Sequence, residues 1–296
     1  ATFEMRETCH SEYGKIKSIL LHPAKNSFVS DANIKEQWQM LNYLSAPDYP
    51  LALKEYDYFQ RLLEQTGATI FTLPTSEKTN IDAIYCRDTS LATDFGLIIG
   101  NMGKAARKNE NIEVALAAKS LGLDILGEIK SPGTLEGGDV AWIDEKTLAV
   151  GHSYRTNEEG IRQLKALLNP KGIEVLVFSL PHYKGQDDVF HLMSIFSPVN
   201  TSVAVVYSPL MPISLRNTLL ERGFNLVEVP DEEWDSMGCN VLAIEPGKCL
   251  LVEGNPITQE RLEKAGCEVI AFPGKAICLP GGGGPTCLTR PLIREI

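Results

Sequence analysis

Short runs of apolar residues recur along the chain, and an amphipathic stretch follows each of them. Runs of this length, bounded by polar residues, are typical of buried strands. The stretches that follow, such as "NEEGIRQLKALL" (157–168), carry apolar residues at helical spacing. The pattern therefore predicts an α/β protein. The five runs are "IKSILLHP" (16–23), "GLIIGNM" (96–102), "TLAVGHS" (147–153), "SVAVVYS" (202–208) and "CLLVEGN" (249–255).

A glycine ends each predicted helix and leads into a second apolar strand. Glycine at this point supplies the left-handed residue that terminates a helix. The spacings between successive glycines are 55, 50, 51 and 43 residues. Any α/β protein alternates strands and helices, but five units in this register favour a repeat whose units close into a ring. The five glycines are Gly67, Gly122, Gly172, Gly223 and Gly266.

The repeats predict one domain over residues 1–296, because no linker rich in Ser, Pro or Gly interrupts them. The first unit carries a long insert at residues 24–50 before its helix. An insert of this length in a compact domain is commonly a lid or binding loop. A surface excursion without function is the alternative, and the sequence leaves both open.

Composition narrows the class of partner. The net charge of −10, with Lys and Arg spread along the chain, argues against nucleic acid or an anionic membrane. The sequence contains neither a membrane-length apolar run nor a signal-peptide pattern. Seven scattered cysteines fit reduced thiols in the cytoplasm and give no zinc-binding spacing, so we expect no metal and no cofactor. A homodimer stays open.

Polar clusters lie between the repeats, and each has a plain structural explanation. Glu136 precedes two glycines, as in a turn, and His191 stands in apolar company like a core histidine. Cys287 follows four consecutive glycines, and a lone cysteine is usually a small buried hydrophobe. Taken together, however, they form one kind of site. A thiolate nucleophile needs a base and the base needs an orienting group, which Cys287, His191 and Glu136 supply.

The remaining charged residues define a substrate of mixed charge. Asp82 and Asp88 provide carboxylates, while Arg107 and Arg155 provide cations. Such a set suits a zwitterionic, amino-acid-like substrate that carries one extra positive charge. The four glycines before Cys287 would let the backbone lie close to that substrate without intervening side chains.

From about residue 10 to the C-terminus, the ordered motifs "RD", "EGGD", "GHSYRTN", "HL" and "GGGGPTC" resemble the guanidine-modifying (pentein) superfamily. Within it, the chain is most similar to dimethylarginine dimethylaminohydrolase and arginine deiminase. The resemblance implies a five-bladed αβ-propeller of pseudo-fivefold ββαβ repeats around a central active site. It also implies a hydrolase that acts on C–N bonds of linear amidines, with a guanidino amino acid as its small-molecule partner.

The same resemblance implies a role for each site residue. Cys287 would be the nucleophile that forms a thiouronium intermediate, and His191 the general acid and base. Glu136 would contact the guanidinium and orient His191, while Asp88 would hold the guanidinium nitrogens. Two further roles concern the amino-acid end of the substrate. Asp82 would bind the α-amine, and Arg155 with Arg107 would bind the α-carboxylate.

One position departs from the deiminase pattern. Arginine deiminases carry an acidic residue two positions after the catalytic histidine, where this chain has Met193. A methionine lining the pocket would suit an N-alkylated arginine, which would give citrulline and an alkylamine. Arg87, by contrast, resembles the deiminase motif, so the subgroup stays open. The alternatives are an amidinotransferase or a deiminase of another guanidino or ureido substrate, and a non-catalytic ribosome-binding protein of the same fold.

Overall fold

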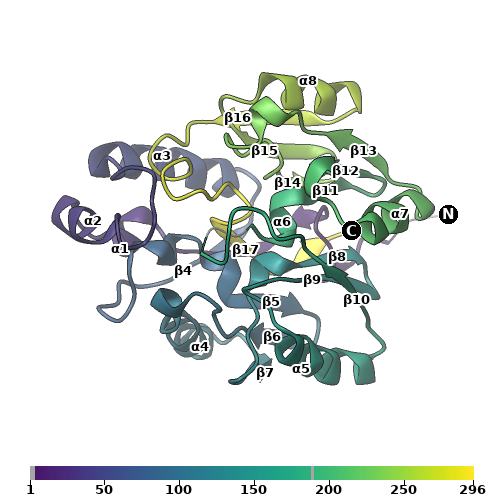
Figure 1. Cartoon of the computed structure of the whole chain (residues 1–296), viewed down its shortest axis with the longest axis horizontal. Coiled ribbons are helices and arrows are strands. Elements are labelled where there is room, and N and C mark those ends of the chain that lie inside the picture. Colours follow the sequence, from purple (N-terminus) through teal and green to yellow (C-terminus); the bar gives the residue numbers. More distant parts are fainter. Residues whose placement is uncertain (1–3, 188–189) are drawn as a thin grey trace.

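In the computed structural model, which describes residues 4–187 and 190–296, five three-stranded sheets share one pairing pattern. In each sheet the middle strand pairs antiparallel with one neighbour and parallel with the strand that follows its helix. The sheets are arranged around the centre of the molecule, with the helices outside them (Figure 1). This is the five-bladed αβ-propeller that the repeats and the resemblance predicted.

The strands of the five sheets are short and mostly buried. In sheet order they are β17 (Thr289–Pro291), β3 (Ser18–Leu21) and β4 (Thr69–Thr72); β5 (Ser90–Thr93), β6 (Gly96–Ile99) and β7 (Ile125–Glu128); β8 (Val140–Asp144), β9 (Thr147–His152) and β10 (Glu174–Ser179); β11 (Phe196–Asn200), β12 (Val203–Val206) and β13 (Asn225–Glu228); β14 (Leu242–Glu245), β15 (Lys248–Val252) and β16 (Glu268–Phe272). A sixth sheet joins β1 (Glu7–Thr8), β18 (Arg294–Glu295) and β2 (Lys15–Ile16).

A helix leads from the middle strand of each sheet back to its parallel neighbour, and in the first blade the insert adds two short helices before it. Apolar residues on one face of each helix pack toward the sheet, as Ile161, Leu164 and Leu168 do in α5. The five connecting helices are α3 (Tyr49–Glu64), α4 (Glu110–Ser120), α5 (Glu158–Leu168), α7 (Ile213–Glu221) and α8 (Pro256–Lys264). Within the described residues, none of the helices combines the length and the apolar character needed to cross a bilayer.

The five glycines that the sequence marked as helix ends all adopt left-handed backbone. Their φ values lie between 74° and 93°. A Cβ at any of them would find open space, so the requirement for glycine comes from the backbone angle and not from crowding. The helix ends were therefore predicted correctly.

The C-terminal segment completes the first blade. Strand β17 pairs antiparallel with β3, so the last blade-forming strand of the chain lies beside the first. The insert at residues 24–50 forms α1 (Ala24–Ser27) and α2 (Asp31–Gln37) and then runs to α3. In this segment the backbone N–H of Leu44 donates to the carbonyl of Pro280, at 2.9 Å. Whether the insert moves as a lid stays a prediction.

A polar segment lies just before the antiparallel edge strand of each blade, at the same position in every repeat. Asp88 lies two residues before β5, and Asp139 directly precedes β8. His191 and the short helix α6 (Leu192–Ile195) precede β11, Asn240 lies two residues before β14, and Cys287 two residues before β17. Because the blades repeat around the centre, these five segments converge although they are far apart in the sequence.

Candidate active site

A cavity of about 460 Å³ lies where these segments meet, and four of the five line it. The residues predicted from the sequence that line the cavity are Asp82, Asp88, Arg107, Arg155, His191 and Cys287. Glu136 is fully buried behind the residues that line the cavity. It bonds to two of them, His191 and Arg155. Seven of the eight predicted residues are thus brought together.

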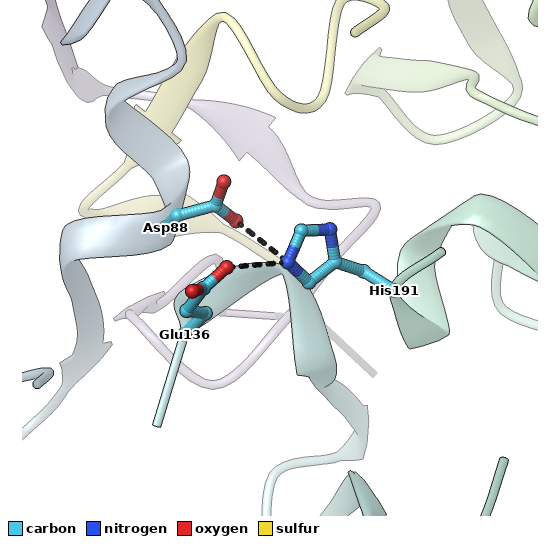
Figure 2. A group of neighbouring side chains, drawn as sticks. All are labelled: Asp88, Glu136 and His191. Atoms are coloured by element: carbon cyan, nitrogen blue, oxygen red, sulfur yellow. Dashed lines mark hydrogen bonds and ion pairs between the residues drawn. The ribbon is translucent and has the colours of Figure 1, made fainter. Parts of the chain in front are cut away.

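His191 is held by carboxylates (Figure 2). Its Nε2 atom lies 2.7 Å from Oε1 of Glu136 and 3.8 Å from Oδ1 of Asp88. Burial alone would lower the pKa of His191, but the charges of Asp88 and Asp139 and the hydrogen bond to Glu136 raise it to about 10. At neutral pH the imidazole is therefore protonated and can give a proton to a leaving group.

Glu136 is the most fully bonded carboxylate of the site. Its Oε2 accepts from the backbone N–H groups of Gly103 (2.9 Å) and Lys104 (3.1 Å). Its Oε1 accepts from Arg155 Nη1 at 3.2 Å as well as from His191. Burial would raise the pKa of Glu136, but the bond to His191 and the neighbouring cations hold it below its usual range. Glu136 therefore stays ionised and fixes three segments at once.

The glycine pair after Glu136 gives room for this arrangement. A Cβ at Gly138 would collide with the Asp88 carboxylate and the His191 ring. The backbone N–H of Gly138 instead donates to Oδ1 of Asp88 at 3.0 Å. The last residue of the motif, Asp139, accepts at Oδ1 from the Leu192 backbone N–H, 3.0 Å away. The "EGGD" motif thereby positions both Asp88 and the segment that carries His191.

Cys287 is partly exposed, lines the cavity and accepts a side-chain hydrogen bond at its sulfur. The side-chain amide of Asn240 donates to the Cys287 Sγ atom at 3.2 Å. The carbonyl oxygen of that amide accepts from the backbone N–H (2.9 Å) and hydroxyl (2.8 Å) of Thr286, which fixes its orientation. This donor holds the sulfur in a fixed position at the cavity. Cys86, which is fully buried, is a different kind of thiol: burial raises its pKa to about 12.

The glycine run before Cys287 packs against protein rather than only against a ligand. A Cβ at Gly281 or Gly283 would collide with the Tyr85 ring, and one at Gly284 with the Asn240 side chain. Gly282 has a φ of +78° and points into open space. The close approach predicted from this run is therefore real, but Tyr85 and Asn240 account for three of the four glycines.

Arg107 lines the cavity and already bonds to two carboxylates of the protein, those of Glu110 and Asp88. Its Nε and Nη2 donate to Glu110 at 2.7 and 2.9 Å, its Nη1 to Asp88 at 2.7 Å and its Nη2 also to the Tyr85 carbonyl at 3.0 Å. Four of the five guanidinium N–H groups make these bonds. These bonds position the Asp88 carboxylate, and the binding of a substrate carboxylate by Arg107 stays a prediction.

The structure corrects the prediction that Met193 lines the substrate pocket. It is 3% exposed, packs in the hydrophobic core and is absent from the described residues that line the cavity. Ser194 lines the cavity instead. The reason is helical spacing: Ser194 stands three residues after His191 and shares its face, whereas Met193 turns away into the core. The inference of an N-alkyl preference from Met193 loses its basis.

Asp88, Glu136 and His191 offer ligand atoms within 4.8 Å of one another, which is a spacing that metal sites use. Two observations favour an acid–base group instead. Arg107 and Arg155 already bond to the two carboxylates. The Nε2 atom of His191 is also already bonded, at 2.7 Å, to Oε1 of Glu136.

The family follows from a match over most of the chain. The family model described as "N,N dimethylarginine dimethylhydrolase, eukaryotic" matches residues 30–294. The chain belongs to this family. With it, the chain belongs to the pentein superfamily that the ordered motifs resemble.

Curated relatives and solved structures agree with this family. The N(G),N(G)-dimethylarginine dimethylaminohydrolase of Pseudomonas aeruginosa is 28% identical over 77% of this chain and 84% of its own length. The arginine deiminase of Listeria welshimeri is 27% identical over 71% of this chain and 61% of its own length. A structure of DDAH from Pseudomonas aeruginosa, a cysteine-to-serine mutant complexed with citrulline, gives a TM-score of 0.73 at 23% identity. It covers 95% of this chain and 100% of that chain, and shows the shared fold.

Sequence reasoning missed several members of this dimethylarginine dimethylhydrolase-family site. Asn240 carries no catalytic motif, but it stands two residues before its strand, where Asp88 and Cys287 stand before theirs. The repeat could therefore have revealed it. Lys104 lines the cavity and pairs with Asp82 at 2.7 Å. No sequence pattern marked it, because a single lysine in a loop is ordinary.

Proposed function

We propose that this protein hydrolyses the guanidino group of arginine or of an N-alkylated arginine, giving citrulline and ammonia or an alkylamine. One observation carries the proposal. A thiol with a hydrogen-bond donor aimed at its sulfur, a carboxylate-bound imidazolium and a second carboxylate all line one cavity. Thiol, proton donor and carboxylate are what covalent guanidine hydrolysis requires.

The proposed chemistry proceeds in two halves. The Cys287 thiolate attacks the central guanidinium carbon, while Asp88 holds guanidinium nitrogens and fixes the plane of the group. The His191 imidazolium protonates the departing nitrogen, the C–N bond breaks, and a thiouronium remains on Cys287. A water molecule then gives a proton to His191 and attacks the same carbon. The added hydroxyl group loses its remaining proton to the departing amine or to solvent as the C–S bond breaks, which releases the neutral ureido product and restores the thiolate.

The names of two relatives support this class of reaction. A dimethylarginine dimethylaminohydrolase and an arginine deiminase each match more than two thirds of this chain. Between their two substrates, the family match favours a methylated arginine. The core position of Met193 gives no reason of its own for either substrate.

A product screen tests the proposal. Ureido product and released amine are measured in parallel over arginine, methylarginines, agmatine and guanidino acids. We expect equal amounts of both products from at least one arginine compound. Cys287→Ser should abolish turnover and the covalent adduct seen by intact-mass spectrometry. Cys9→Ser is the matched control, because Cys9 is also partly exposed but lies outside the described lining of the cavity.

Two results would contradict the proposal. Turnover by Cys287→Ser would exclude the nucleophile. Transfer of the amidino group to an added amine, with no ureido product, would replace hydrolysis by amidino transfer.

A further inference from the structure

Three arginines that take no part in the proposed reaction are buried where blades of the propeller meet. Arg290 lies on β17, Arg294 on β18, and Arg87 three residues before β5. Each of these side chains is 4% exposed or less. The Nη2 atom of Arg290 donates to the Arg87 carbonyl at 3.1 Å, and Nη1 of Arg294 to the Ala243 carbonyl on β14 at 2.8 Å. Segments of three blades therefore meet at this arginine cluster.

The cluster contains more positive than negative charge. Among the described residues, its one ion pair joins Arg87 Nη1 to Oε1 of Glu12, 3.6 Å away. The charge of Glu12 also acts on Arg290 and Arg294. Asp88 acts on Arg290 as well, but its carboxylate already bonds to another cation at 2.7 Å. Three guanidinium groups are thus buried with a single carboxylate of their own.

Several guanidinium nitrogens of the cluster are buried and have no hydrogen-bond partner within residues 4–187 and 190–296. They are Nη1 and Nη2 of Arg87, Nε of Arg290, and Nε and Nη2 of Arg294. A buried donor that lacks an acceptor is destabilising, and more so when it carries a charge. The cluster therefore calls for an acceptor that also brings negative charge.

Neither deprotonation nor water meets both needs. Burial and the charge of Arg87 lower the pKa of Arg290 to about 9 and that of Arg294 to about 10. Both arginines therefore stay protonated at neutral pH. A buried water molecule accepts hydrogen bonds but brings no charge. A small anion supplies the acceptor and the charge together.

We propose that the arginine cluster binds a small monovalent inorganic anion of the class of chloride. The unpartnered N–H groups supply the hydrogen bonds, and the surplus positive charge supplies the attraction. A spherical anion accepts donors from several directions, which suits groups that come from three blades. The described residues that line the central cavity include none of the three arginines, so this site does not rest on the proposed function.

The cluster bonds to segments that carry the proposed catalytic residues. The Nε atom of Arg87 donates to the carbonyl of Thr286, which directly precedes Cys287. The Nη2 atom of Arg290 also approaches the carbonyl of Gly137 in the "EGGD" motif, at 3.4 Å. An anion that holds these arginines thereby holds the backbone beneath the active site. We expect it to stabilise the folded protein.

Replacement of one anion by another tests the proposal on the wild type. The full chain is refolded from urea in potassium gluconate, and Tm is measured as chloride replaces gluconate at constant ionic strength. An anion that binds the folded state alone raises Tm once its concentration exceeds Kd. Constant ionic strength keeps general screening equal at every point. We expect chloride and bromide to raise Tm. Anomalous diffraction from a crystal grown in bromide should show one ion in contact with the cluster.

Two substitutions should shift the chloride response in opposite directions. Arg294→Gln removes one positive charge and should abolish most of the rise in Tm. Glu12→Gln removes the competing carboxylate and should lower the chloride concentration at which Tm begins to rise. Arg162→Gln is the matched control, because Arg162 is an exposed arginine that pairs with Glu159 on the surface. It should keep the wild-type response.

Three outcomes would overturn this inference. The first is a Tm that does not rise as chloride replaces gluconate. The second is a cluster that holds only water in the bromide crystal. The third is an unchanged chloride response in both Arg294→Gln and Glu12→Gln, which would place the anion elsewhere. If Arg294→Gln does not fold, Glu12→Gln and the bromide crystal decide. These measurements do not involve turnover, so failure of the proposed function would leave them unaffected.

Discussion

The Nε2 atom of His191 lies 2.7 Å from Oε1 of Glu136, and the same carboxylate binds the loops of Lys104 and Arg155. The proton donor of the proposed reaction and two loops of the cavity wall therefore share one buried carboxylate. Glu136 fixes the positions of these three segments relative to one another.

The raised pKa of His191 predicts how stability depends on pH. The group binds its proton more tightly in the folded protein, with a pKa of about 10, than in an unfolded chain, where it is about 6.5. The resulting stabilisation is fully present below pH of about 6.5 and disappears as the pH rises through about 10. We expect the wild type to lose more free energy of unfolding than His191→Gln between these two pH values.

Urea unfolding of both proteins at pH 6.5, 8 and 9.5 measures this difference, and the variant cancels the titration of other groups. Parallel curves for the two proteins would show that His191 is not held as an imidazolium. Glu136→Gln should lie between them, because Asp88 and Asp139 still act on the histidine.

Asn240→Asp should reduce the reactivity of Cys287. The substitution keeps the shape of the side chain but replaces the N–H donor, 3.2 Å from sulfur, by a negative oxygen. Loss of a hydrogen bond to a charged group costs about 1.5–3 kcal/mol, which corresponds to roughly tenfold to a hundredfold in rate. We expect this decrease in the alkylation of Cys287 by iodoacetamide at pH 7, followed by peptide mass spectrometry. An unchanged rate would remove Asn240 from the site.

The repeats and the helix ends could be predicted because they depend on local features of the sequence, whereas the set of candidate site residues came from the ordered motifs and the family that they resemble. Gly67 and Gly122 show this, since each needs a left-handed φ that few residues other than glycine adopt. The ion pair between Asp82 and Lys104 could not be predicted, because it depends on how two segments of the chain meet in space. Sequence order also cannot say which way a side chain points.

The glycine run before Cys287 contains two different requirements, which substitutions can separate. At Gly282 the φ of +78° is the constraint, so Asn should be tolerated better than Ala. At Gly283 the Tyr85 ring is the constraint, so Ala and Asn should both destabilise the protein, by about 1–3 kcal/mol or more. Thermal unfolding of the four variants tests this. Equal tolerance of Asn at both positions would mean that Tyr85 does not close on the loop.

Met193 gives the sharpest contrast between the motif and the structure. If Met193 lined the substrate pocket, Met193→Asp would yield a folded enzyme with a preference for arginine. In the core, where it is 3% exposed, the new carboxylate would be buried among apolar side chains. We expect a loss of stability above about 3 kcal/mol, or no folded protein. Met193→Leu, which nearly conserves volume, should cost less than about 1.5 kcal/mol.

The conservative variant keeps the prediction testable when Met193→Asp does not fold. Met193→Leu should leave the ratio of kcat/KM for Nω-methylarginine and arginine within about twofold of wild type, because the side chain does not touch the substrate. Ser194→Ala is the comparison, since Ser194 lines the cavity and its Oγ accepts from the His191 backbone N–H at 3.1 Å. Urea unfolding and the two-substrate ratio are measured for all three variants. A stable Met193→Asp that prefers arginine would return Met193 to the pocket and restore the argument for an N-alkylated substrate.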